Sequence, residues 1–297
     1  MAGQAQHYFD ADRLVDLLRP ARKTRVVDVG ANPINDNPYA NLRDAGHCHV
    51  WGFEPDPRAY ERLTSKPDET YLPHAVGDGQ RRKLHVTRMP SLTSLLEPNP
   101  PAHAYLQRMS KPITVEQEIE FDTVRLDDLD EPDDFDLLKI DVQGGELLVY
   151  DGAAQRLSTV CAVITEVGFL PIYKHQPLLD SQMAALRGHG LMLHKFLFLK
   201  GLSLRGGLAT RLDKRRHRNQ LIDGDAIFIR DLLEPDAVDD EKLKHLAILA
   251  DGVLESFDLA VRCLDLLIAR GRVAQEAAER YVDLLPMLGE PARARSA

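Results

Sequence analysis

Four acidic side chains stand at or near the ends of short apolar runs in the first half of the chain. They are Asp28, Glu54, Asp78 and Asp141. Carboxylates accept hydrogen bonds from hydroxyl and ammonium groups, and they can take a proton from a substrate. Open parallel sheets bind ligands beyond the carboxyl ends of their strands. If the apolar runs are successive parallel strands, we expect the four carboxylates to gather around one ligand.

The segment VVDVGANPIND, residues 26–36, has the composition of a loop that binds a nucleotide cofactor. A β-branched run precedes Asp28, and Gly30 leaves little side chain between backbone and ligand. The phosphate motifs G-x-G-x-x-G and G-x-x-x-x-G-K-[ST] are absent, which argues against a pyrophosphate or triphosphate ligand. S-adenosylmethionine, which has no phosphate, fits better. Asp28 could bind it, and Glu54, after the next strand, could accept both ribose hydroxyls unless it is only a solvated strand end.

Length and composition predict one main α/β domain with an appendage. The chain has 297 residues, of which 44% are hydrophobic, and a net charge of -9 that disfavours general nucleic-acid binding. Its three cysteines form neither a disulfide framework nor a zinc motif. We see no signal peptide and no apolar run of transmembrane length, so we expect a cytoplasmic protein without a membrane span.

The elements that must position the carboxylates follow from periodicity and turn residues. A helix is expected over 10–19, covering the sheet, and another over 178–188. Residues 89–112 predict a long loop with a short helix, and the last two strands are expected to pair antiparallel. The predicted strands lie within residues 26–36, 49–57, 71–76, 83–87, 136–146, 161–169, 191–199 and 225–230.

The remaining two segments are expected to be an appendage and a basic loop. Residues 240–285 repeat apolar side chains every three or four positions, which predicts two helices. We therefore expect a catalytic domain over 1–230 and a helical extension over 231–297. We expect the extension to pack on the sheet domain or on a second subunit, and the second alternative would give a homodimer through the C-terminal helices. Residues 200–218 hold seven Lys or Arg against one acid, so they form either a solvated loop or a patch for an anionic substrate.

Four motifs, VVDVGAN, GFEP, AVGD and LLKIDVQGGELLVYDGA, resemble the FkbM-type methyltransferase family in order and approximate spacing. The resemblance implies a seven-stranded Rossmann-like fold with helices on both faces that binds S-adenosylmethionine and methylates a hydroxyl oxygen. Carried over by position, Asp28, Gly30 and Asn32 match the cofactor loop. Glu54 matches the ribose-binding acid, and Asp78 matches the residue near adenine. Asp141 matches the acid of the K-I-D-V-E-G-x-E signature.

Two positions depart from the family pattern. Ile34 replaces the second glycine of the cofactor loop, which leaves the path after Asn32 open. Gln143 replaces the first glutamate of the signature, so it keeps an acceptor, adds a donor and loses a charge. A catalytic role at position 143 is therefore disfavoured.

Methyl transfer from a sulfonium to an alcohol needs an aligned hydroxyl and a base for its proton. Asp141 is the first candidate, although it could equally position the cofactor's amino group or cap the next helix. Glu166, on the following strand, and His175, in the loop after it, are alternatives. Carboxylates 141 and 166 could also hold Mg²⁺, but no compact ligand motif supports a metal, and we predict none.

The sequence therefore predicts an S-adenosylmethionine-dependent O-methyltransferase. Its acceptor is a small molecule or glycan, namely a hydroxyl of a sugar, glycolipid or secondary metabolite. A cofactor-binding regulator without turnover is the alternative, motivated by Ile34 and Gln143. An NAD-dependent reductase is disfavoured by the missing glycine motif.

Overall fold

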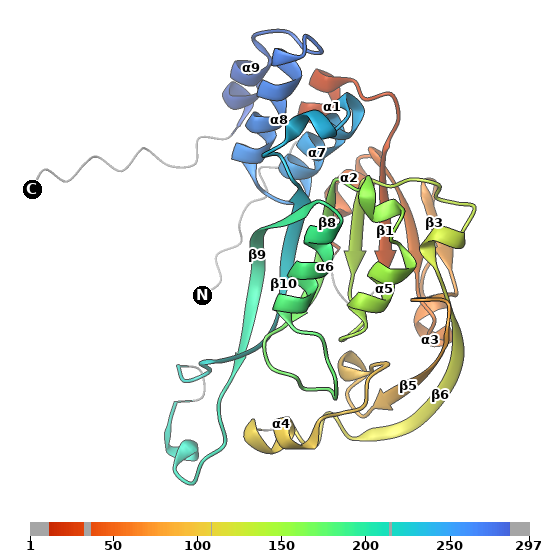
Figure 1. Cartoon of the computed structure of the whole chain (residues 1–297), viewed down its shortest axis with the longest axis vertical. Helices are drawn as coiled ribbons and strands as arrows, with labels where there is room; N and C mark the ends of the chain where they lie inside the picture. The colour runs from red at the N-terminus through yellow and green to blue at the C-terminus, as the bar shows by residue number, and fades with distance from the viewer. Residues whose placement is uncertain (1–11, 33–36, 108, 214–215, 286–297) are drawn as a thin grey trace, which may run out of the picture. The chain divides into compact units, whose positions relative to one another are not determined.

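Seven strands form a mixed sheet in the order β3-β2-β1-β7-β8-β10-β9 (Figure 1). β3, β2, β1, β7 and β8 run parallel, and β10 pairs antiparallel with both β8 and β9. This arrangement confirms the predicted Rossmann-like α/β sheet and the antiparallel pairing of the last two strands. The bounds are β1 Thr24–Val29, β2 Cys48–Phe53, β3 Glu69–Leu72, β7 Leu137–Ile140, β8 Ala162–Gly168, β9 Leu191–Leu202 and β10 Gln220–Arg230.

This computed structural model describes residues 12–32, 37–107, 109–213 and 216–285. Ile34 lies outside the described residues, so its effect on the cofactor loop stays a prediction. Two compact units make up the described chain. The sheet unit holds residues 24–32, 48–107, 109–213 and 216–234, and the helical unit holds residues 12–23, 37–47 and 235–285. The helical unit thus includes segments from the N-terminal part of the chain besides the predicted extension.

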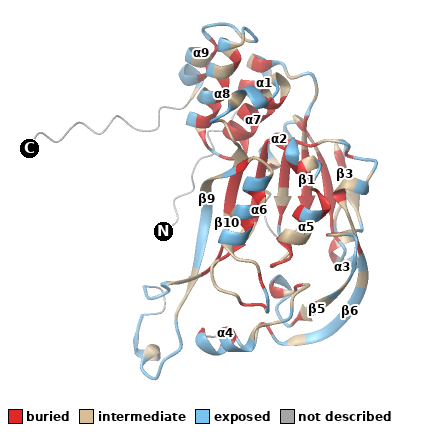
Figure 2. Cartoon of the chain, viewed as in Figure 1, coloured by how far each residue is buried: buried red, intermediate tan, exposed pale blue. Residues whose placement is uncertain are grey.

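Two helices, α5 (Glu146–Gly152) and α6 (Leu179–Gly188), cover one face of the main sheet. Successive strand residues point to opposite faces, so every second residue of each strand packs on these helices. The shared core includes Val27, Leu138, Val163 and Phe228 from the strands, all at most 1% exposed. Figure 2 shows the central strands buried along most of their length. The alternate residues, which include Asp28, Lys139 and Glu166, belong to the opposite face.

A second, three-stranded sheet has the order β4-β6-β5. Its strands are β4 Ala75–Val76, β5 Arg81–Thr87 and β6 Val115–Val124. The predicted strand 71–76 is therefore wrong as one element: Pro73 lacks a backbone N–H, and the chain changes sheets between β3 and β4. The predicted strand 83–87 is confirmed within β5.

Sequence reasoning missed β6 because most of its side chains are polar and exposed (Figure 2). Ion pairs between β5 and β6, rather than a buried apolar face, join the side chains of these two strands. Lys83 Nζ lies 2.9 Å from Glu118 Oε2, and Arg81 Nε lies 3.2 Å from Glu120 Oε2. Both ion pairs join diagonal neighbours, because Lys83 and Arg81 stand opposite Glu120 and Asp122 in the register. Opposite charges across an antiparallel pair favour this register.

The predicted long loop at 89–112 contains one 3-10 helix and one short α-helix among its described residues, 89–107 and 109–112. α4 spans Pro100–Tyr105. Buried apolar residues of the loop, including Leu92, Leu106 and Met109, form a small core with Tyr173 and Ile222. The other short helices of the sheet unit are α3 Pro57–Tyr60 and the 3-10 turns Pro90–Leu92, Leu126–Asp128, Arg156–Ser158 and Ala209–Arg211.

The helical unit contains three C-terminal α-helices where two were predicted. Its helices are α1 Asp12–Leu18, α2 Ala40–Asp44, a 3-10 turn Pro235–Ala237, α7 Asp240–Gly252, α8 Phe257–Ala269 and α9 Ala277–Leu284. The apolar period continues from α7 into α8 because both helices bury one face. The backbone nevertheless breaks at Gly252, and Glu255 has φ +47°. The sequence period alone does not show this break.

α1 contacts α7 and α9 within the helical unit, and the prediction that this helix covers the sheet stays a prediction. Arg13 of α1 lies 4.0 Å from Asp251 of α7, and both side chains are buried. Tyr281 of α9 donates its hydroxyl to Asp251 Oδ1 at 2.8 Å. A buried charge must be paired, so this cluster ties α1 and α9 to α7.

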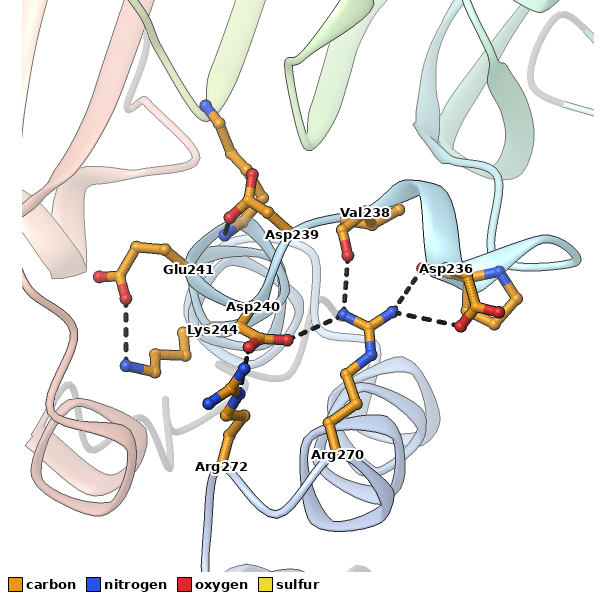
Figure 3. Close-up of polar contacts among 10 residues, drawn as sticks. Asp236, Val238, Asp239, Asp240, Glu241, Lys244, Arg270 and Arg272 are labelled. Atoms are coloured by element: carbon orange, nitrogen blue, oxygen red, sulfur yellow. Dashed lines mark hydrogen bonds and ion pairs between the residues drawn. The ribbon is translucent and has the colours of Figure 1, made fainter.

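Arg270, at the end of α8, joins α8 to the segment that starts α7 (Figure 3). Its guanidinium donates to Val238 O at 2.7 Å, Pro235 O at 2.6 Å and Asp240 Oδ1 at 3.0 Å. We expect Arg270→Ala to lower the free energy of unfolding by about 1–2 kcal/mol, because two carbonyls lose their donor. Arg272, 60% exposed and paired with the same Asp240, is the matched control. Arg272→Ala should cost at most about 0.5 kcal/mol in urea unfolding. Equal losses would contradict this role.

Candidate functional site

The carboxyl ends of β1, β2 and β7 meet through backbone hydrogen bonds. Gly30 N donates to Phe53 O at 2.9 Å, and Asp141 N donates to Val29 O at 3.0 Å. Glu54 N donates to Leu72 O at 3.1 Å on the other side. The turn residues after these strands therefore lie at one edge of the sheet, where open α/β sheets bind ligands.

Asp28 and Lys139 form an ion pair inside this edge. They are register partners on β1 and β7, and Lys139 Nζ lies 2.9 Å from Asp28 Oδ1. The Asp28 side chain is fully buried, and that of Lys139 is 16% exposed. Burial acts to lower the pKa of Lys139, but Asp28 and Asp141 raise it overall. Asp28 therefore neutralises a neighbouring cation, and direct contact with a cofactor stays a prediction.

Glu54 is a buried acceptor at the end of β2. It is 6% exposed, and its Oε1 accepts a hydrogen bond from Asp56 N at 2.8 Å. Burial raises its pKa, with further contributions from the charges of Asp56 and Asp28. The charge of Asp28 thus acts on Glu54, and the gathering of both acids around one ligand stays a prediction. A desolvated carboxylate gains from hydroxyl donors, which suits a ribose.

Asn32 follows the β1 turn, and its Oδ1 is buried without a hydrogen-bond partner among the described residues. A buried acceptor without a donor costs free energy, and a ligand that brings a hydroxyl or ammonium donor would recover it. Asn32 and Glu54 thus fit the polar groups of an adenosine-type cofactor. Both lie on the strand ends that the sequence predicted.

Gly30 has a structural reason to be glycine. Its φ is +85°, and a Cβ would lie 2.2 Å from Asp141 O. The small residue therefore lets the ends of β1 and β7 approach each other. This packing constraint is sufficient to explain the glycine. That Gly30 also opens the backbone to a ligand stays a prediction.

Gln143 links the carboxylates of Asp141 and Glu166. Its Nε2 donates to Asp141 Oδ1 at 3.0 Å and also to Glu166 Oε2. The residue has φ +55°, and its carbonyl accepts the hydroxyl of Ser94 at 2.6 Å. The amide group that Gln143 has in place of the family's glutamate therefore donates two hydrogen bonds. A glutamate here would put a third carboxylate between two others.

Two acids on β10, Asp225 and Asp223, join this edge and were missed from the sequence. Asp225 is the register partner of Glu166, and Asp223 lies 2.8 Å from Lys200 Nζ. Burial and the charge of Asp141 raise the pKa of Asp225 to about 6. Because β10 runs antiparallel, its beginning meets the carboxyl end of β8. The sequence signal was the pair of acids at the start of an apolar strand, Ile-Asp-Gly-Asp-Ala-Ile.

Glu166 is partly buried among these acids. Burial raises its pKa well above the ordinary value, and the charges of Glu146, Asp141 and Asp223 raise it further, while Lys200 lowers it. A carboxylate with a raised pKa is a stronger base once ionised. Asp141, by contrast, is exposed.

Glu146, the last acid of the signature, is 1% exposed at the start of α5. Its Oε1 accepts Gly144 N at 2.9 Å, and burial raises its pKa to about 7. Gly144 and Gly145 are buried too, and a Cβ on Gly144 would lie 3.2 Å from Leu96. These signature residues therefore pack against protein, and ligand approach to the two glycines stays a prediction.

The raised pKa of Glu146 makes stability depend on pH. The folded state holds this proton up to about pH 7, whereas the unfolded chain releases it near 4.5. The stabilisation is full below 4.5 and is lost as pH rises through 7. Glu146→Gln should therefore gain about 1–3 kcal/mol relative to wild type between pH 5 and 8. Urea unfolding at each pH measures this, with exposed Glu61→Gln as control. Parallel pH curves for wild type and Glu146→Gln would contradict the assignment.

Asp78 does not end a strand of the main sheet, which corrects the prediction of four successive parallel strands. It follows β4 in the second sheet and pairs with Arg82. The Arg82 guanidinium, against the effect of burial, holds the pKa of Asp78 below its usual range. Contact with adenine stays a prediction for this residue.

His175 lies in a turn after β8, is exposed and has φ +57°. No hydrogen bond or ion pair within the described chain joins it to Asp141 or Glu166. Nor do the described residues contain a group of three His, Cys, Asp or Glu suited to a metal. None of the described helices is long and apolar enough to span a bilayer.

The chain matches the family described as "Methyltransferase FkbM domain" over residues 28–193. No curated protein matches it. Among solved structures, it is similar to a putative S-adenosylmethionine-dependent methyltransferase from Listeria monocytogenes, with 11% identity, TM-score 0.35, and coverage of 74% of this chain and 96% of that chain. A putative methyltransferase of an antibiotic biosynthesis pathway from Anabaena variabilis has 8% identity, TM-score 0.30, and coverage of 88% and 86%. The assignment of this chain to a family rests on the family match alone.

Proposed function

We propose that this chain, which belongs to the FkbM methyltransferase family, transfers a methyl group to a hydroxyl oxygen of a sugar, glycolipid or secondary metabolite. Its cofactor is S-adenosylmethionine, as the sequence predicted. The observation that supports the reaction type is the joining of Asp141 and Glu166 by Gln143 at the ends of β7 and β8.

Glu54 and Asn32 would hold the cofactor, because they offer a desolvated carboxylate and a buried amide oxygen. When bound, the cofactor supplies an electrophilic methyl group. The protein then has to orient the acceptor hydroxyl and accept its proton during attack. Asp141, exposed and held by Gln143, accepts this proton in our proposal, and Glu166 is the second candidate.

The first test is calorimetric titration with S-adenosylmethionine and S-adenosylhomocysteine, with NAD as control. Saturable binding of the first two supports the proposal and leads to screening of hydroxylated acceptors by mass spectrometry. Binding without transfer to any acceptor would favour the alternative of a regulator that has lost turnover. Binding of NAD alone would contradict both. A homodimer and a cytoplasmic location stay predictions.

A further inference from the structure

Exposed apolar side chains gather on the hairpin that joins the two last strands. We define the β9–β10 arm as residues 197–213 and 216–220. It carries six of the thirteen large apolar side chains that are exposed in the described chain, namely Leu197, Phe198, Leu199, Leu204, Leu208 and Leu212. Leu208 is 69% exposed and Leu212 is 53% exposed. Figure 2 shows this hairpin as largely exposed. Such clustering on one segment marks an interaction surface.

The arm is also basic, although the whole chain has a net charge of -9. Asp213 is the acid among its described residues, and its Oδ1 accepts the backbone N of Arg216. The cations of the described arm are Lys200, Arg205, Arg211, Arg216 and Arg218. The charge of this surface is therefore opposite to that of the protein.

Backbone hydrogen bonds hold the base of the arm in place. Arg205 N donates to Tyr105 O at 2.8 Å, and Gln107 N donates to Ser203 O at 3.0 Å. A cavity of about 320 Å³ lies at this junction, lined in part by Gln107, Leu204 and Leu212. The leucines and arginines are thus presented on an anchored hairpin.

We propose that the β9–β10 arm docks on the surface of an anionic lipid bilayer. Apolar side chains enter the headgroup and acyl boundary, while Lys and Arg contact the phosphates of anionic lipids. Leucines interleaved with arginines satisfy both requirements. Single-stranded nucleic acid would need stacking aromatics, and Phe198 is the arm's aromatic among the residues described. Lys200 lies 2.8 Å from Asp223, so the arm begins beside the candidate site.

The test is sedimentation of the full chain with phosphatidylcholine vesicles, with and without phosphatidylglycerol. We expect at least about tenfold tighter binding to the anionic vesicles, weakened by salt. Leu208→Ser/Leu212→Ser and Arg211→Glu/Arg216→Glu should each reduce binding about tenfold or more. Leu233→Ser, at a residue 79% exposed, and Arg187→Glu, exposed on α6, are matched controls outside the arm. They should change binding less than about twofold.

Circular dichroism melting checks that all variants fold. No binding to anionic vesicles, equal binding to both kinds of vesicle, or equal losses in the controls would overturn the proposal. If the chain binds a single-stranded RNA homopolymer but not vesicles, and the arm variants lose the RNA binding, the arm is assigned to nucleic acid. If the chain does not bind vesicles, and light scattering shows a dimer that Leu208→Ser/Leu212→Ser loses, the arm is assigned to contact with a second copy of this chain.

Discussion

Asp141→Asn should lower the single-turnover rate of methyl transfer by about 10²–10⁴-fold, the range that a general base contributes. Asparagine keeps the shape of the side chain, and its Oδ1 can still accept the hydrogen bond from Gln143 Nε2. It cannot take a proton from the acceptor hydroxyl. We therefore expect the affinity for S-adenosylmethionine to stay within about threefold of wild type, because the loss is confined to the transition state.

Glu166→Gln is the matched variant, since Gln143 donates to this carboxylate as well. If Glu166 is the base, the rate should rise with pH as its raised pKa is passed, and this rise should vanish in Glu166→Gln. Full activity in Asp141→Asn would remove Asp141 as the base. A large loss of cofactor affinity in Asp141→Asn would instead show that Asp141 positions the cofactor.

The acids at strand ends can be predicted from the sequence where an apolar run marks the strand itself. Asp28, Glu54 and Asp141 each follow an apolar run, and parallel pairing of β1, β2 and β7 brings those ends together. Asp78 also follows such a run, but the run belongs partly to a second sheet. A local pattern predicts a strand and leaves open which sheet it joins, because that depends on long-range pairing.

Side-chain partners were harder to predict than positions. The sequence showed that Gln143 gains a donor, but only the fold shows that this donor contacts both Asp141 and Glu166. Asp225 reaches the site because β10 is antiparallel and in register with β8. Neither contact follows from spacing along the chain, since each depends on how two distant strands align.

The Asp28–Lys139 pair also fixes the edge that carries the site, and breaking it should have a large effect on stability. Lys139→Met should lower the free energy of unfolding by about 3–5 kcal/mol at pH 7, because the fully buried Asp28 carboxylate loses this cation. Urea unfolding of the wild type and of Lys139→Met at pH 7 measures the difference.

A second substitution separates charge from packing. Asp28→Asn removes the carboxylate at nearly constant shape, so Asp28→Asn/Lys139→Met should be more stable than Lys139→Met alone, with a coupling of about 1–3 kcal/mol. Lys83→Met is the surface control: its partner Glu118 is 49% exposed, and water screens the pair, so the loss should be well below that of Lys139→Met. If Lys83→Met and Lys139→Met cost the same, burial does not decide the strength of these pairs. If the double variant is no more stable than Lys139→Met, the lysine stabilises this edge through packing of its stem, and the neutralisation of Asp28 is not what holds β1 against β7.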